Sequence, residues 1–504
     1  MSFKAFSRDL EGNSISSIKS KRSQSALEYM MTYGWAILII VIVAVILYSM
    51  GIFNPSSSIT FTSSGFSPFT VSSSLCNNLG YKIAVLAGPI PNNANSLTIS
   101  KVYLTSATGA NATTASYTLK NPVTLKSGQS ATILIPNVAC NAANVHYSIS
   151  ANIQYSYTAS TLGLQTVNTT GTVAGTSISG KPSVLTSYEP VTITNSQSTA
   201  TPSPFQQMVN FTSSDPGWTS ISTSNFGQNV EFFYYNGTVI PSWLQNYTSD
   251  NATWWLKIAA IPAGSSETVY VGFAPTSTNL FNTVNDGEAP QLSLTYAEYD
   301  DGANVFVYYT SFDSLTSPSG MYIYSTSGET FDFTSHGFYM TGSTSNTGDG
   351  YLVTNNSYSN SYVILSFTTI PTSSTGTSYR PFLQVYGIGI ATDQYGFGAQ
   401  GFTVMTTSGI LGEVSSLPYY FGTLMPQYEV NGTLSIEYYG SNYVVRDNAQ
   451  NTIGGSYSGS YASNMPSKIA IGSESSYTVR YNYLVVGNSP PNNIMPSVSF
   501  GSLA

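Results

Sequence analysis

The chain has 504 residues and a formal net charge of −8, and only 8% of its residues are charged, against about 25% in ordinary soluble proteins. Its 15 Lys and Arg are too few and too scattered for a basic surface, which excludes nucleic acid as a partner. Aromatic residues make up 13% of the chain, enough to build hydrophobic cores, which excludes a wholly disordered protein.

The N-terminal segment combines basic residues, one acidic residue and a long apolar run. Three basic residues between positions 19 and 22 precede Ser23 and Gln24, and Glu28 is the only charged residue in the next 30. Residues 30–53 carry no charge, and a helix of that length, about 36 Å, would cross a bilayer. Positive charge before the run predicts a cytoplasmic N-terminus, with the rest of the chain outside.

This order of residues resembles the class III signal of archaeal type IV pilins. The resemblance implies that a prepilin peptidase cuts between Ser23 and Gln24, which makes Glu28 the fifth residue of the mature chain. It also implies that the new amine of Gln24 neutralises Glu28 during assembly with other pilin-like subunits. Residues 1–23 would be a cytoplasmic leader, and residues 24–54 a hydrophobic transmembrane and assembly helix. The alternative is an uncleaved signal anchor.

Beyond the apolar run no segment shows sustained helical periodicity. Short runs rich in Val, Ile, Thr, Tyr and Phe alternate with clusters of Gly, Asn, Pro and Ser, which indicates strands and turns. Asn-Gly pairs at 236–237 and 431–432 lie between such runs and predict β-hairpins. The expected fold class is mainly β, with an N-terminal transmembrane helix followed by three β-sandwich-type extracellular modules.

The first module, residues 55–183, resembles the compact β-domain of archaeal pilins. It holds both cysteines, Cys76 and Cys140, and an even pair in an exported segment predicts a disulfide. No Asp or Glu occurs from residue 54 to residue 188. Acid unfolds proteins largely by protonating carboxylates, so this module should tolerate acid, and an acidic habitat is the hypothesis that follows.

The second module, residues 184–290, resembles a family of uncharacterised β-sandwich domains from archaeal and bacterial surface proteins. The resemblance rests on the runs PSW at 241–243, WWLK at 254–257 and IPAG at 261–264. In that family a concanavalin-like, laminin-G-like jelly roll commonly follows, and the two ends of residues 291–504 are similar to its first and last strands. The tryptophans of the second module are expected in cores or on sheet faces rather than in a ligand platform.

No complete catalytic constellation accompanies these modules. Glu298 and Asp300 would share one face of an extended strand, as in glucanases with a jelly-roll fold, but Gly302 stands where a third acid would complete that arrangement. His146 and His336 fall in different modules, and no G-x-S-x-G motif is present. The chain is therefore predicted not to be an enzyme, and to need no cofactor apart from a possible Ca²⁺.

Two further sets of residues are candidates for sites. Four aspartates in a region of few charges could offer oxygen ligands to calcium, with solvated loop acids as the alternative: Asp300, Asp301, Asp313 and Asp332. Eight Asn-x-Ser/Thr sequons permit glycosylation without arguing for it: Asn111, Asn168, Asn210, Asn236, Asn246, Asn251, Asn355 and Asn431.

These residues predict a non-enzymatic archaeal cell-surface pilin-like subunit or adhesin, processed by a prepilin peptidase and assembled through its N-terminal helix. Its expected partners are the membrane, the peptidase, other pilin-like subunits and surface glycans. It would be a single-pass membrane protein with an extracellular bulk, or part of a cell-surface filament. The alternative function is a membrane-anchored carbohydrate-binding surface protein that forms no filaments.

Overall fold

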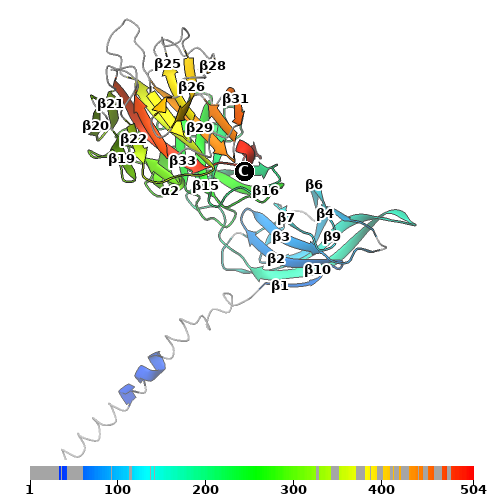
Figure 1. Ribbon diagram of the computed structural model, residues 1–504. Helices are drawn as coiled ribbons and strands as arrows, with labels where there is room; N and C mark the ends of the chain where they lie inside the picture. Colours follow the sequence, from blue (N-terminus) through cyan, green and yellow to red (C-terminus); the bar gives the residue numbers. More distant parts are fainter. Residues whose placement is uncertain are drawn as a thin grey trace, which may run out of the picture. The chain divides into compact units, whose positions relative to one another are not determined.

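A computed structural model of the chain groups the residues into two compact units, 1–180 and 181–504 (Figure 1). The structure describes residues 33–35, 37–42, 61–91, 94–112, 116–136, 138–140, 142–324, 328–341, 351–369, 381–385, 388–393, 401–408, 412–413, 419–421, 431–440, 442–446, 452–458, 468–473 and 478–504.

The N-terminal apolar run is described only in part. Residues 33–35 and 37–42 are α-helical, and the six apolar side chains from Ile37 to Ile42 are each 48–66% exposed. Among the described residues, no helix combines the length and the hydropathy that a membrane span requires. Ser23, Gln24 and Glu28 lie outside the described residues, so the transmembrane helix stays a prediction.

The folded part of the first unit consists of antiparallel sheets around one core. The larger sheet has the order β1 (Thr62–Gly65), β10 (Gly163–Thr176), β9 (His146–Ala159), β4 (Leu97–Thr108) and β6 (Ser116–Leu125). The smaller sheet joins β2 (Phe69–Asn77), β3 (Gly80–Ala87) and β7 (Ser130–Ile135), and a short pair joins β5 (Asn111–Ala112) to β8 (Val138–Ala139). Buried residues alternate along β9, because successive residues of a strand point to opposite faces.

The second unit begins with a sandwich of two four-stranded sheets. One sheet has the order β13 (Val230–Phe233), β16 (Ser265–Phe273), β11 (Ser187–Asn195) and β34 (Ser497–Phe500). The other has the order β12 (Phe205–Thr212), β15 (Asn251–Ile258), β14 (Ser242–Tyr247) and β17 (Asp286–Glu288). Because β34 is the last strand of the chain, the sandwich is built from two stretches of sequence, with the jelly roll between them.

Two larger antiparallel sheets form the jelly roll around a separate core. The first has the order β20 (Thr330–Thr334), β21 (Gly337–Thr341), β33 (Thr478–Asn488), β23 (Ser361–Thr369), β29 (Asn431–Tyr439), β30 (Asn442–Arg446) and β31 (Thr452–Ser458), with β18 (Tyr308–Thr310) beside β33. The second has the order β19 (Met321–Tyr324), β22 (Tyr351–Thr354), β32 (Ile469–Ser473), β24 (Pro381–Val385), β25 (Ile388–Asp393), β26 (Gly401–Ser408) and β27 (Gly412–Glu413), with β28 (Tyr419–Phe421) beside β26.

Among the described residues of the second unit, the helices are single turns between strands. They are η3 (Trp218–Ser220), α2 (Gly302–Val305) and η5 (Pro491–Asn493). The prediction of a mainly β fold is therefore confirmed for the described residues. The division of residues 181–504 at position 290 stays a prediction. The strands β18 and β33 lie in the two ends that were expected to form the first and last strands of the jelly roll, and they pair with each other.

A shared aromatic layer joins the sandwich to the jelly roll. Trp254 faces the core of the sandwich, whereas its neighbour Trp255 points the other way and stacks on Tyr362 of β23, with ring centroids 4.9 Å apart. Trp243 packs edge-on against Tyr483 of β33 at 5.1 Å. These three tryptophans are at most 3% exposed, which confirms the expectation that they lie in cores.

The two predicted hairpins have different outcomes. At 236–237 the chain makes a turn: Gly237 has φ +80°, and its N–H donates to the oxygen of Tyr234 at 2.8 Å. The prediction at 431–432 is wrong, because Asn431 begins β29 and Gly432 pairs with Phe367 of β23. There the backbone groups that a tight turn would have needed pair with β23 instead.

Candidate functional site

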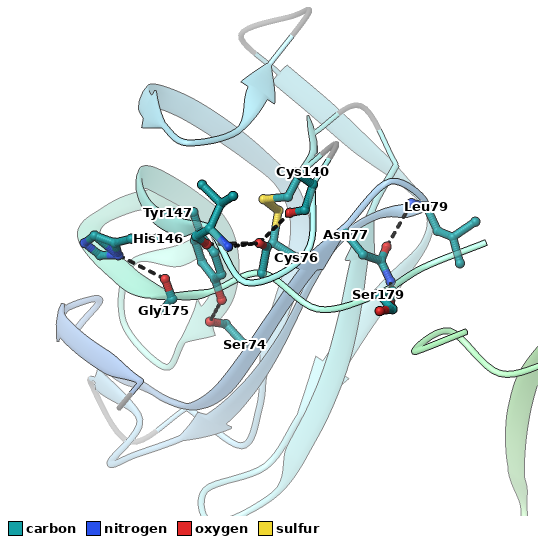
Figure 2. Close-up of a disulfide and its surroundings, with 12 residues drawn as sticks. Ser74, Cys76, Asn77, Leu79, Cys140, His146, Tyr147, Gly175 and Ser179 are labelled. Carbon is teal, nitrogen blue, oxygen red and sulfur yellow. Dashed lines mark hydrogen bonds between the residues drawn. A yellow bond between two sulfur atoms is a disulfide. The ribbon is translucent and has the colours of Figure 1, made fainter. Parts of the chain in front are cut away.

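The disulfide is confirmed in the first unit. Cys76, on β2, is bonded to Cys140, which follows β8, with 5.5 Å between their Cα atoms (Figure 2). The N–H of Cys140 donates to the backbone oxygen of Asn77 at 2.8 Å, and the Asn77 side chain donates to the oxygen of Ser179 at 3.4 Å. The disulfide thus lies beside the last residues of the first unit, which are hydrogen-bonded to β2 through the side chain of Asn77.

Each histidine ring lies within hydrogen-bond distance of a backbone or hydroxyl oxygen. His146 places Nδ1 3.0 Å from the oxygen of Gly175 on the paired strand β10, as Figure 2 shows. His336 is exposed, with Nδ1 2.8 Å from Ser335 Oγ. No hydrogen bond in the described part of the chain joins either ring to a carboxylate, so neither belongs to a Ser-His-Asp arrangement there.

The sequons lie on the surface wherever their side chains are described. Glycosylation of these asparagines stays a prediction. The exposed ones are Asn111, Asn168, Asn210, Asn236, Asn246, Asn251 and Asn355, while the side chain of Asn431 lies outside the described residues.

The four candidate calcium ligands do not form one site. Asp313 and Asp332 are exposed, whereas Asp300 is partly buried and Asp301 is 2% exposed. In the described residues, no group of three or more His, Cys, Asp or Glu side chains is arranged to hold a metal ion. The structure therefore separates these aspartates: Asp313 and Asp332 are on the surface, and Asp300 and Asp301 lie near a different set of acids.

That cluster lies between β17 of the sandwich and the segment before α2. Asp301 approaches Gly287 so closely that a Cβ on this glycine would lie 2.1 Å from Asp301 Oδ1. Asp286 is 4% exposed, and its Oδ2 accepts a hydrogen bond from Asn282 Nδ2 at 3.2 Å. Glu288 is 2% exposed and accepts from Ser293 Oγ at 2.8 Å. Asp286 and Glu288 on β17 and Asp301 before α2 are thus all buried, and Asp301 lies against the glycine between the other two.

Asp300 joins the two modules through its hydrogen bonds. Its Oδ1 accepts from Trp243 Nε1 on β14 at 3.0 Å and from the N–H of Gly302 at 3.1 Å. Its Oδ2 accepts from the hydroxyl of Tyr309, on β18, at 2.8 Å. One carboxylate therefore contacts a strand of the sandwich and a strand of the jelly roll.

Burial raises the pKa of every acid in this cluster. Burial, with a smaller effect from Glu231, raises the pKa of Asp286 to about 8. Burial, with smaller effects from Asp300 and Asp286, raises the pKa of Asp301 to about 9. The pKa of Glu288 rises to about 7 and that of Asp300 to about 6, again mainly through burial. Burial thus favours the neutral forms of Asp286 and Asp301.

Sequence reasoning missed Glu231, Asp286 and Glu288. The available signal was the run Asp286-Gly287-Glu288 in a chain with 8% charged residues. The prediction that Glu298 and Asp300 share a strand is wrong, because residues 291–299 form turns and bends and Glu298 is exposed. The paired-acid arrangement of a glucanase strand is therefore absent at this position.

Comparisons with known proteins are limited in extent. No protein-family model matches the chain. Uncharacterized protein 562 of Sulfolobus islandicus rod-shaped virus 1 is 38% identical over 130 residues, which are 25% of this chain and 22% of that protein. The chain thus matches less than a quarter of the length of this relative.

Several solved structures resemble 36% of the chain over 99% of their own length. One, from a study of endo-acting O-glycanases in human gut microbiota, has 9% identity and a TM-score of 0.27. A glycosyl hydrolase family protein of Mycobacterium fortuitum has 10% and 0.24, and the carbohydrate recognition domain of Emp46p has 11% and 0.25. TM-scores of this size carry no argument about activity.

These matches nevertheless correct the prediction that the chain is not an enzyme. That prediction is withdrawn, because proteins named as glycosyl hydrolases stand among the similar structures. The same low TM-scores assign neither a substrate nor a catalytic residue to this chain.

Proposed function

We propose that the chain is a cell-surface pilin-like subunit or adhesin, cut before Gln24 and held by its N-terminal helix in a membrane or a filament. The observation that carries the proposal is the order of Ser23, Gln24 and Glu28 ahead of an uncharged apolar run. The exposed apolar side chains of Ile37 to Ile42 support it, because such a surface is stable only in lipid or against other helices.

The order of residues predicts one new N-terminus. N-terminal sequencing or intact-mass measurement of the protein purified from membranes should give a mature chain that begins at Gln24. A chain that still begins at Met1 would contradict the hypothesis of pilin-type cleavage, and the uncleaved signal anchor would be the interpretation that remains.

Assembly is tested separately from cleavage. Glu28→Gln should leave cleavage and the β-structure intact but reduce the protein recovered in sheared filaments, since the buried amine of Gln24 would lose its counter-charge. Glu11→Gln is the matched control, because residue 11 leaves with the leader. A protein of a rod-shaped virus is among the relatives, so the fractions include released particles as well as membranes and filaments.

The alternative function is glycan binding by a membrane-anchored protein that forms no filaments. It is favoured by the jelly roll, since paired antiparallel sheets of this kind are a fold that lectins use. A glycan array with the detergent-solubilised full chain tests it, and mass spectrometry of the same glycans would detect cleavage. Binding without recovery in filaments would select this alternative over the pilin-like subunit.

A further inference from the structure

The hairpin of β9 and β10 in the first unit extends beyond the other strands of its sheet (Figure 1). The two strands pair with each other along their whole length, up to Ala159 and Gly163 at the turn. On the β9 side the last residue that pairs with β4 is Ser156, and on the β10 side β1 covers only residues 171–174. Among the described strands, therefore, no third strand pairs with the residues next to the turn.

The end of this hairpin presents exposed leucines. Leu162, in the turn, is 68% exposed, and Leu164, at the start of β10, is 70% exposed. Val167, farther along β10, is 37% exposed. Nearer the core, Tyr155 is 4% exposed and stacks on Tyr157, with ring centroids 6.3 Å apart. A hairpin that is held by the core of its unit thus offers two leucines to its surroundings.

The same end of the hairpin carries no charge. No Asp, Glu, Lys or Arg occurs between Lys126 and Lys181, and His146 lies at the other end of β9. On the neighbouring strand, Lys101 pairs with Gln154, five residues before the end of β9. Burial of the turn in an apolar medium would therefore remove no charged side chain of the hairpin from water.

Two carbonyl groups of the turn are satisfied within the hairpin. Gln165 donates from Nε2 to the backbone oxygen of Leu162 at 2.9 Å and to that of Leu164 at 3.2 Å. Gly163, between them, has φ +69°, a conformation that glycine adopts without strain. In water such carbonyls need no internal donor, because water hydrogen-bonds to them. In a medium without donors an unsatisfied carbonyl is costly, so the two bonds from Gln165 suit the turn to that medium.

These observations favour the apolar layer of a lipid bilayer over the surface of another protein. Protein interfaces use hydrogen bonds and a polar rim around their apolar centre. The end of this hairpin instead combines exposed leucines, an absence of charge and internally satisfied carbonyls. A surface needs that combination in lipid, where neither water nor another donor is present.

We propose that the turn between β9 and β10 is a lipid-contact loop, which inserts Leu162 and Leu164 into the outer layer of a bilayer while Gln165 satisfies the backbone between them. This contact is additional to the N-terminal helix. Asn168, a predicted glycosylation site, lies four residues beyond Leu164, about 13 Å along the strand. Interfacial elements penetrate only about 5–10 Å, so a glycan on Asn168 would stay in water.

A fluorescent label beside the leucines tests this contact. Cys76 and Cys140 are the two cysteines of the chain and are bonded to each other, so a cysteine introduced into the full chain is its single free thiol. Thr161→Cys, in the turn, and Ala143→Cys, at an exposed position before β9, place an environment-sensitive dye at opposite ends of the hairpin. Vesicles of phosphatidylcholine, with and without nitroxide groups on the acyl chains, provide the bilayer.

Vesicles should shift the emission of the dye at position 161 to shorter wavelength, and the nitroxide groups should quench it. The dye at position 143 should show neither effect, because the 14 residues of β9 span about 45 Å. If the chain binds vesicles while both dyes stay in water, the lipid contact is overturned and the proposed function still stands. A shift that needs no vesicles and grows with protein concentration also overturns it, because a second copy then covers the turn.

Substitutions in the chain labelled at position 161 test the leucines themselves. Leu162→Asn together with Leu164→Asn should abolish the shift and the quenching, since these exposed side chains supply the apolar surface. Leu294→Asn together with Leu315→Asn, at positions of the second unit that are 95% and 75% exposed, should leave both signals unchanged. Equal effects of the two pairs of substitutions would contradict the proposal.

Gln165→Leu separates the satisfied carbonyls from apolar area. This variant adds apolar surface to the turn but removes the donors to Leu162 and Leu164. The shift and the quenching should therefore decrease, because two carbonyl groups would enter the lipid unsatisfied. If apolar area alone drove insertion, the same variant would insert more deeply. An unchanged or larger signal would thus overturn the part that the proposal gives to Gln165.

Discussion

Gly287 separates two buried acids on β17, and its missing side chain is what allows a third to approach. A Cβ there would lie 2.1 Å from Asp301 Oδ1 and 2.6 Å from the backbone oxygen of Tyr299. The Tyr299 oxygen also accepts the N–H of Glu288 at 3.1 Å, so it cannot move without breaking that bond. One residue without a side chain thus determines whether the acidic cluster can form.

Gly287→Ala should lower the free energy of unfolding of the second unit by about 1–3 kcal/mol, because the added methyl group forces Asp301 or the backbone aside. Urea unfolding followed by tryptophan fluorescence measures this change. Gly34→Ala, in the other unit, should leave this transition unchanged, since a Cβ at Gly34 has no neighbour within 4 Å. Equal stability of wild type and Gly287→Ala would show that the junction is packed less tightly than described.

The strand β34 shows how an element at the very end of the chain completes a sheet made much earlier. Phe500 pairs with Val191 of β11, and its ring lies 4.5 Å from that of Phe211, edge to face. Ser499, its neighbour, faces solvent. Because the strand is only four residues long, we expect its side chains in the core to contribute to holding it in place.

Phe500→Ala should destabilise the sandwich by about 2 kcal/mol, less than for a fully buried phenylalanine, since the ring is only partly buried. Ser499→Ala, on the opposite face of the same strand, should change stability by less than about 0.5 kcal/mol. Thermal unfolding of the two variants beside the wild type makes the comparison. Similar losses in both would mean that β34 contributes through its backbone rather than through this ring.

Across the whole molecule, we expect the two units to respond to pH for different reasons. The first unit has no Asp or Glu from residue 61 to residue 180, so acid finds no carboxylate to protonate. The second unit has many carboxyl groups. Because burial raises the pKa of Asp286 and Asp301, protonation of these two acids should stabilise the folded unit. Both properties suit an acidic environment, the habitat that the composition of the first module suggested.

Calorimetry of the full chain should resolve this difference as two transitions. From about pH 8 to about pH 4 the transition of the first unit should stay nearly constant, while that of the second unit should rise. Reduction of the Cys76–Cys140 disulfide identifies the first transition, because it removes roughly 2–5 kcal/mol from that unit alone. A first transition that falls steeply in acid would contradict the argument from composition.

Much of the fold could be predicted from local patterns. Runs rich in Val, Ile, Thr, Tyr and Phe predicted a mainly β fold, and the even pair Cys76 and Cys140 predicted the disulfide. The burial of Trp243 and Trp255 followed from their size and apolar neighbours. Prediction was wrong for Asn431-Gly432, where a local turn signal lost to pairing with a strand more than 60 residues away.

The sequence by itself therefore determined the β class, the disulfide and the acid-poor character of the first unit, because each depends on residue type or on neighbours a few positions away. Only the tertiary structure decided that β34 returns to β11 and that Asp301 lies against Gly287. These contacts join distant stretches, or opposite sides of a turn, through packing that no local pattern encodes. Asp301, which looks like a solvated loop residue in the sequence, is buried against Gly287 for that reason.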